Sequence, residues 1–123
     1  MNELPVLLDT NFVLSCYRFG ILLEEIDQVV DKAHQVFVPC NVLEELEQLH
    51  LKGRDREAQK IMLEILKQYP VLPLHGKVDT SLLEYARKHE CIICTNDRDL
   101  RKKLRKIGRR SIVVKARTHL GVE

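Results

Sequence analysis

The chain has 123 residues, of which 45% are hydrophobic and 31% are charged, a composition typical of one soluble globular domain. No apolar run is long enough to cross a bilayer, and residues 1–8 lack the basic start and long apolar region of a signal peptide. We therefore expect a cytoplasmic protein with one domain over residues 1–117 and a short C-terminal tail over residues 118–123.

The positive charge is concentrated near the C-terminus. The net charge is only +2, but residues 98–117 hold ten basic residues and one acid (net +9), whereas residues 1–97 hold ten basic and sixteen acidic residues (net −6). A basic segment on an acidic body suits a polyanion, because Lys and Arg neutralise phosphates and release counterions. A solvated helix face is the alternative explanation.

The N-terminal segment predicts a strand followed by a helix. Residues 4–8 form a continuous apolar run that ends at Asp9, which is typical of a central parallel strand. Thr10 and Asn11 offer caps for a helix that stops at Gly20. Because the helix needs only one N-cap, Asp9 is free for another role.

The middle of the chain continues this alternation of strand and helix. The expected elements are an amphipathic helix over residues 21–33, a strand over 36–38, a helix from 41 onward, a charged helix over 54–68 and an edge strand over 71–74.

The segment NVLEELEQL contains three candidate glutamates. Asn41 and Glu44 have the spacing of a capping box, which gives Glu44 a structural role. Placing successive residues about 100° apart puts Glu45 and Glu47 on the two borders of the apolar face. Helical spacing does not choose between them, although Glu45 lies nearer to the amino end of the helix.

The third quarter of the chain predicts a further helix and a strand-to-helix junction. A helix is expected from Asp79, which is itself a good N-cap, although Thr80 or Ser81 could cap it instead. Residues 91–95 predict a short buried strand and residues 98–107 a helix, so Asp97 lies where strand passes into helix. In an open parallel sheet, ligands bind at such junctions.

The cysteines are expected to be free thiols. Cys91 and Cys94 have the spacing of half a zinc site, but residues three apart in a strand point to opposite faces, and no second CxxC or HxxxH completes four ligands. Buried thiols fit a reducing compartment.

The whole pattern predicts an α/β fold, namely a three-layer sandwich with a central, mainly parallel sheet of about five short strands flanked by helices. The fifth strand is expected over residues 111–114. Four acids, Asp9, Glu45, Asp79 and Asp97, lie at or near element junctions.

These four acids suggest a metal centre. Carboxylates gathered within a few ångströms are driven to protonate unless cations neutralise them. Hard divalent ions such as Mg²⁺ or Mn²⁺ take oxygen ligands of this kind, and one or two such ions can promote phosphodiester hydrolysis. The sequence contains no GxSxG elbow and no Walker A loop that would indicate other chemistry.

Four segments resemble the blocks of the PIN domain family in order and spacing. They are LLDTN at 7–11, PCNVLEELEQL at 39–49, VDTSLLEYA at 78–86 and CIICTNDRDL at 91–100. Members are typically metal-dependent ribonucleases with an acidic centre at the carboxyl edge of a parallel sheet. The resemblance implies that the four acids are Asp9, Glu45, Asp79 and Asp97, and it favours Glu45 over Glu44 and Glu47.

The resemblance extends to residues around the acids. Asn11 and Thr95 correspond to polar residues that support the site. DRDLRKKLRKIG is also similar to small, archaeal-type single-domain members related to ribosomal RNA processing, where an acid such as Asp99 follows the fourth one, so Asp99 is given a supporting role. The residues expected to hold the RNA backbone are Arg98, Arg101, Lys102, Arg105 and Lys106.

The resemblance and the charge pattern together predict a small endoribonuclease that uses Mg²⁺ or Mn²⁺, with a role in ribosomal RNA processing as one expectation. Many members of the family pair, so a homodimer is expected. A toxin of a toxin–antitoxin pair, with an antitoxin as protein partner, is one alternative. A non-cleaving RNA-binding or assembly module is another. A receiver-like signalling domain needs paired acids after the first strand, and only Asp9 is present there.

Overall fold

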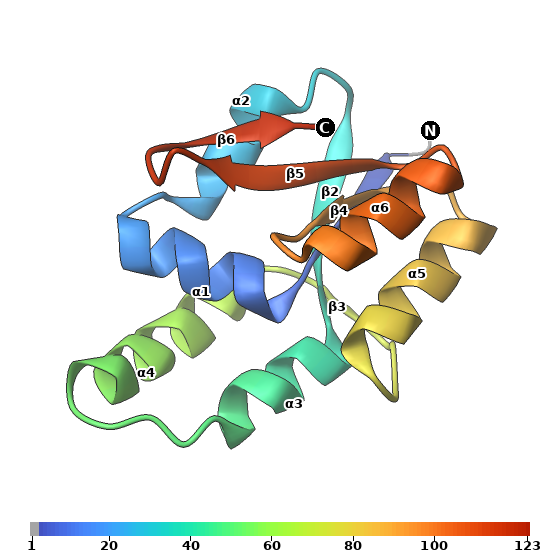
Figure 1. Cartoon of the computed structure of the whole chain (residues 1–123). Coiled ribbons are helices and arrows are strands. Elements are labelled where there is room, and N and C mark those ends of the chain that lie inside the picture. Colours follow the sequence, from blue (N-terminus) through green and yellow to red (C-terminus); the bar gives the residue numbers. More distant parts are fainter. Residues whose placement is uncertain (1–2) are drawn as a thin grey trace.

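The computed structural model describes residues 3–123, which form a sheet flanked by helices (Figure 1). The elements in chain order are β1 (Leu4–Leu8), α1 (Thr10–Phe19), the 3-10 helix η1 (Leu23–Glu25), α2 (Ile26–Val29), β2 (His34–Pro39), α3 (Cys40–Gln48), α4 (Arg54–Leu66), β3 (Val71–Leu72), α5 (Val78–Lys88), β4 (Ile92–Cys94), α6 (Arg98–Lys106), β5 (Arg110–Lys115) and β6 (His119–Val122). The expected three-layer α/β sandwich is confirmed.

The sheet has the strand order β3-β2-β1-β4-β5-β6, and its first five strands in chain order run parallel. β1 lies in the centre, with Leu7 opposite Phe37 of β2 on one side and Ile93 of β4 on the other. Parallel strands bring their carboxyl ends to one edge. The residues that follow β1, β2 and β4 therefore meet there, although they are far apart in the chain.

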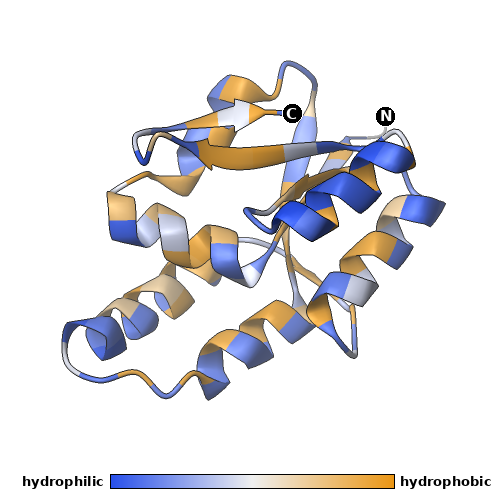
Figure 2. Ribbon diagram, viewed as in Figure 1, coloured by the Kyte–Doolittle hydropathy of each residue, from blue (hydrophilic) through white to orange (hydrophobic). Residues whose placement is uncertain are grey.

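The hydrophobic core forms on both faces of β1. Val6, Leu7 and Leu8 are completely buried, which is why this strand is a continuous apolar run. Each fully buried side chain of this size stabilises the fold by about 1.5–3 kcal/mol. Helices contribute buried residues from one face only, and Figure 2 shows α6 largely hydrophilic, broken by apolar positions.

The prediction of a single helix over residues 21–33 is wrong. Instead, the short helices η1 and α2 lie in this region. Gly20 adopts a left-handed conformation (φ 69°), and the amide of Ile21 donates to the carbonyl of Cys16 at 2.8 Å. Ile21 therefore belongs to the C-cap of α1 and does not begin a new helix. Val30 is already extended, and the chain then turns toward β2.

Over residues 3–123 the sheet has six strands rather than about five, because the expected tail over residues 118–123 contains β6. This strand pairs antiparallel with β5, with Lys115 opposite His119. Ala116 and Arg117 in the connecting turn have φ values of 52° and 59°. Turns of this kind usually contain Asn or Gly. Ala and Arg at these two positions therefore do not indicate a hairpin.

The four cysteines are free, as expected. Cys16, Cys91 and Cys94 are buried, and burial raises the pKa of Cys16 to about 12 and that of Cys91 to about 11. These thiols are therefore protonated core residues. Within residues 3–123, every helix is too short or too polar to span a bilayer.

Candidate metal centre

A cavity of about 320 Å³ opens at the carboxyl edge of the sheet. Its walls come from the residues that follow β1 and β4, from the N-terminal halves of α1 and α5, and from the second half of α3 up to its C-cap, Leu49. The residues that line it are Asp9, Thr10, Asn11, Leu14, Glu45, Leu49, Lys77, Val78, Asp79 and Asp97. The structure thus brings the four acids predicted from sequence into one cavity, which is called the carboxylate cavity below.

Asp9 is the most buried of the four acids, with 6% of its surface exposed. Its Oδ1 accepts a hydrogen bond from the Thr10 amide at 2.8 Å, and its Oδ2 accepts one from the Thr95 hydroxyl at 2.7 Å. Asp9 is itself the N-cap of α1, so the expectation that Thr10 or Asn11 caps this helix is wrong. A carboxylate has two oxygens, and only one of them is used in capping.

Burial raises the pKa of the Asp9 carboxyl above its ordinary value, and the hydrogen bonds from Thr95 and Thr10 offset only part of this effect. The negative charges of Glu45 and Asp97 raise this pKa further. The acids are therefore close enough to repel one another. A bound cation would lower the pKa of Asp9, because its positive charge favours the ionised carboxylate.

Asn11 and Thr95, the predicted supporting residues, connect the segments that follow β1 and β4. The Asn11 Oδ1 accepts from the Asn96 amide at 3.0 Å, and the Thr95 hydroxyl accepts from the Asp97 amide at 3.1 Å. Because Thr95 also donates to Asp9, one buried hydroxyl fixes the spacing of two acids.

Asp97 caps α6 while lining the cavity. Its Oδ1 accepts hydrogen bonds from the amides of Asp99 (2.9 Å) and Leu100 (3.2 Å). The second oxygen has no such restraint among the described residues. Asp99, the other predicted supporting acid, is exposed and does not line the cavity. The structure thus gives its backbone amide, rather than its carboxylate, a contact with the site.

Glu45 and Asp79 approach the cavity from two helices, α3 and α5. Glu45 is exposed, and Asp79 is half-buried, with its Oδ1 accepting from the Thr80 amide at 2.8 Å. Glu44 does not line the cavity, and Glu47 lines a different one. The position of α3 thus separates three glutamates that helical spacing left as alternatives.

The predicted capping box of Asn41 and Glu44 is wrong. α3 begins at Cys40, so Asn41 lies inside the helix and is buried. Its amide donates to the Ser81 hydroxyl at 2.8 Å and to the Gly76 carbonyl at 3.2 Å. This bridge connects the helix that contains Glu45 to the start of the helix that contains Asp79. Local sequence spacing could not reveal this bridge, because Ser81 and Gly76 are 40 and 35 residues from Asn41 in the chain.

The donor set of the carboxylate cavity fits a hard cation. As the side chains of residues 3–123 lie, no three His, Cys, Asp or Glu residues form an assembled metal-binding group. Four carboxylates nevertheless line one cavity, and these oxygens are the ligands that Mg²⁺ and Mn²⁺ prefer. Glu45 is exposed, so its side chain can change rotamer without disturbing the core.

Lys77 also lines the carboxylate cavity, although sequence reasoning gave it no role. It is exposed and occupies the N-cap position of α5, two residues before Asp79. That proximity to a predicted site acid is the signal that could have identified it. Among residues 3–123, it is the one basic residue that lines this cavity.

The basic residues predicted to hold RNA lie on α6 and outside the carboxylate cavity. Arg98, Lys102, Arg105 and Lys106 are exposed. Arg101 differs from them in the strength of its contact with Glu123, since its guanidinium lies 2.7 Å from that carboxylate and its side chain is only 21% exposed. Arg105 is 3.8 Å from the same carboxylate, and its side chain is 67% exposed. The charge of Arg101 is already paired within the protein.

Comparisons with known proteins agree with this geometry. The sequence model of a PIN like domain matches residues 6–117. Ribonuclease VapC4 of Methanocaldococcus jannaschii is 30% identical over 103 residues, which cover 78% of this chain and 79% of that protein. Ribonuclease VapC9 of Archaeoglobus fulgidus is 34% identical over 73 residues, covering 58% of this chain and only 54% of that protein.

The fold also matches a solved structure, described as that of the PIN domain endonuclease Utp24. The TM-score is 0.80 at 28% sequence identity, and the match covers 97% of this chain and 90% of the other. The family match extends from β1 through β5 and includes all four acids of the carboxylate cavity. The chain therefore belongs to the PIN-like domain family.

Proposed function

We propose that the protein is a metal-dependent endoribonuclease that hydrolyses RNA phosphodiester bonds at the carboxylate cavity. The observation that carries this proposal is the convergence of Asp9, Glu45, Asp79 and Asp97, from four separate elements, on one cavity. Two relatives named as ribonucleases and one structure named as a PIN domain endonuclease support the same activity.

The four acids would hold Mg²⁺ or Mn²⁺. Asp9 and Asp97 are the fixed ligands, because backbone amides and Thr95 hold their carboxylates in place. Glu45 and Asp79 complete the set from α3 and α5. The ion, when bound, would supply an activated water and neutralise the charge that develops on the phosphate. Hydrolysis of this type leaves a 5′-phosphate and a 3′-hydroxyl.

Basic side chains bind the substrate backbone in this proposal. Lys77 contacts a phosphate oxygen at the cavity, where its charge offsets part of the repulsion between the acids and the RNA. The exposed residues of α6, namely Arg98, Lys102, Arg105 and Lys106, bind phosphates beside it. Arg101 has a structural role toward Glu123. A homodimer and an antitoxin partner stay predictions of the family resemblance.

Metal-dependent cleavage is the first test. The protein is incubated with structured and single-stranded RNA in Mn²⁺, with and without chelator, and the ends of the products are identified chemically. We expect cleavage in Mn²⁺, none in chelator and none for Asp9→Asn, with 5′-phosphate ends. Cutting that persists in chelator, products with 2′,3′-cyclic phosphate ends, or an inert wild type would each contradict the proposal.

Two adjacent glutamates of α3 provide a matched test of the site. Glu45→Gln removes a carboxylate that lines the cavity, whereas Glu44→Gln removes an exposed one that does not. The first variant should lose about tenfold or more in kcat/KM and the second should keep the wild-type value. Equal effects of the two substitutions would remove Glu45 from the site.

A further inference from the structure

A second cavity, of about 590 Å³, lies beside the carboxylate cavity. It is formed by the end of α3, the connecting loop and the first turns of α4. Leu49 lines both cavities, so the two adjoin at this residue. The ionisable residues around it are His50, Lys52, Arg56, Lys60 and Glu47. Among the described residues, the lining of this cavity thus contains one acid, three cations and one histidine.

These cations are free to bind an anion. Lys52, Arg56 and Lys60 are exposed, and none of them takes part in an ion pair among residues 3–123. Arg56 and Lys60 are four residues apart on α4, a spacing at which like charges repel and destabilise a helix by a few tenths of a kcal/mol. An anionic ligand would remove that repulsion.

Gln59 fixes this basic cluster relative to the carboxylates. It lies on α4 between Arg56 and Lys60 and is only 9% exposed. Its amide donates to the carbonyls of Leu46, Glu47 and Leu49 at the end of α3. The start of α4 is therefore bound to the helix that contains Glu45, and Figure 1 shows α3 and α4 side by side.

We propose that Lys52, Arg56, Lys60 and His50, here called the α3–α4 basic surface, bind phosphates of the RNA strand that crosses the carboxylate cavity. The strand would leave the cavity over the apolar side chain of Leu49. This inference rests on the proposed function and deepens it, because it assigns one side of the substrate path to a surface distinct from α6.

Electrostatics explains why such a surface belongs next to this cavity. Four carboxylates repel a phosphate backbone, and Lys77 is the one cation of the described chain that lines their cavity. Phosphates on either side of the scissile bond need cations outside the carboxylate cavity. Lys77 cannot reach them, since Coulomb forces at a surface are screened within about 10 Å. The α3–α4 basic surface meets this requirement because it adjoins the cavity at Leu49.

The sequence conceals this surface because the charges alternate in sign. Asp55 and Glu57 lie among the four cations of residues 52–60, so this segment has a net charge of +2, against +9 for residues 98–117. In the helix α4 the acids point in a different direction from Arg56 and Lys60. These two cations line the second cavity, whereas Asp55 and Glu57 do not.

The test compares two variants that each remove two lysines and one arginine. Lys52→Ala, Arg56→Ala and Lys60→Ala are combined in one protein. Lys32→Ala, Arg87→Ala and Lys88→Ala are combined in the control, which removes exposed cations from the opposite edge of the sheet. Both variants therefore have the same net charge, and a thermal melt of each checks that it folds.

Affinity for single-stranded RNA is measured across a salt series in chelator, so that nothing is cut. Each lost phosphate contact on a single strand flattens the slope of log K against log salt by about 0.7, so the first variant should lose about 2 from the slope and about tenfold in affinity at low salt. The control should match the wild type. A first variant that binds RNA like the control would overturn the inference.

Cleavage in Mn²⁺ separates this inference from the proposed function. If the wild type cuts RNA and the two variants cut long substrates equally well, the RNA-binding role of the α3–α4 basic surface is wrong, and the proposed nuclease activity is supported. If RNA binding depends on this surface but the wild type never cuts RNA, the proposed nuclease activity is wrong, and the RNA-binding role of the surface is supported. A selective loss of kcat/KM on long strands, with a dinucleotide substrate cut as before, supports both.

Discussion

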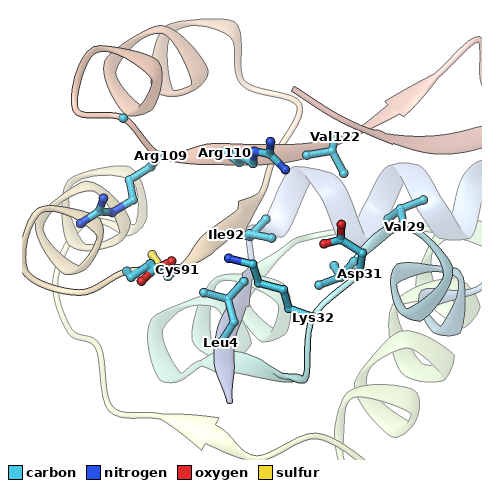
Figure 3. Close-up of a pocket in the computed structure, with 12 residues that line it drawn as sticks. Leu4, Val29, Asp31, Lys32, Cys91, Ile92, Arg109, Arg110 and Val122 are labelled. Carbon is cyan, nitrogen blue, oxygen red and sulfur yellow. The ribbon is translucent and has the colours of Figure 1, made fainter. Parts of the chain in front are cut away.

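The two edges of the sheet have cavities of very different character. A cavity at the amino edge, lined by the starts of β1, β4 and β5, has a volume of about 560 Å³, against about 320 Å³ for the carboxylate cavity. Figure 3 shows that side chains of both signs surround the larger cavity, including Asp31, Lys32 and Arg110. Arg109 is used within the fold, since its Nε donates to the carbonyls of Ala86 (2.8 Å) and His89 (3.2 Å) at the end of α5.

The difference lies in charge rather than in volume. Opposite charges at the amino edge can satisfy one another, and a guanidinium there closes a helix end. At the carboxyl edge, four acids face one lysine, and the pKa of the buried Asp9 is raised. Groups of one sign that repel one another indicate a site for a cation better than an open volume does.

The largest expected effect separates the two edges by activity. Asp97→Asn replaces an acid at the carboxylate cavity, and Glu90→Gln replaces one at the amino edge. Loss of a proposed metal ligand should lower kcat by about a hundredfold or more, whereas the amino-edge change should have no effect on RNA cleavage. If Glu90→Gln is as inactive as Asp97→Asn, the assignment of the two edges is wrong.

The second prediction separates positioning from stability. Asn41→Ala removes the bridge to Ser81 and Gly76, and Arg109→Ala removes the contacts at the end of α5. Each change should cost about 1–2 kcal/mol in the free energy of unfolding, measured by urea denaturation. Only Asn41→Ala should also lower kcat, by about tenfold, because it loosens the spacing of Glu45 and Asp79.

Equal kcat values for Asn41→Ala and Arg109→Ala, at temperatures where both are folded, would show that the bridge has no role beyond stability. Asn41→Asp, which keeps an acceptor but loses the amide donor, provides a second variant in case Asn41→Ala fails to fold.

The third prediction concerns stability and pH. Because burial raises the pKa of Asp9 in the folded state, folding favours its protonated form, and stability is lost as the pH rises through that pKa. In chelator, Asp9→Asn should therefore be more stable than the wild type at neutral pH, and this advantage should shrink in acid. Urea denaturation at several pH values measures it. An advantage that does not vary with pH would contradict this account of Asp9.

The smallest expected effect concerns α6. Lys102→Ala with Lys106→Ala should flatten the salt dependence of single-stranded RNA binding by about 1.4, or about 0.7 for each lost contact. Arg101→Ala should leave that slope unchanged, since the Arg101 charge is already paired with Glu123. A large change in slope from Arg101→Ala alone would mean that the ion pair opens to bind RNA.

The sequence predicts the frame of the site because strand ends are local features. Asp9 and Asp97 directly follow apolar runs, and parallel strands bring such positions to one edge. Helical spacing left Glu45 and Glu47 as alternatives, because it describes one helix and not the surface that this helix faces. Resemblance to the PIN family favoured Glu45, and in the structure Glu45 lines the cavity while Glu47 does not.

Contacts between distant segments could not be predicted. Asn41 has the right spacing for a capping box, but its partners in the structure are Ser81 and Gly76. Arg101 is indistinguishable in sequence from its basic neighbours, and only β6 brings Glu123 beside it. In both cases, tertiary packing decided which of several locally equivalent roles a side chain has.

Direct measurement of metal binding tests the central claim, that the carboxylate cavity is a divalent metal centre. Mn²⁺ is titrated into the wild type, into Asp9→Asn with Asp97→Asn, and into Glu90→Gln, and free Mn²⁺ is counted by electron paramagnetic resonance. We expect one or two bound ions in the wild type and in Glu90→Gln, and loss of binding in the double variant. Equal binding by the double variant, or none by the wild type, would contradict this claim.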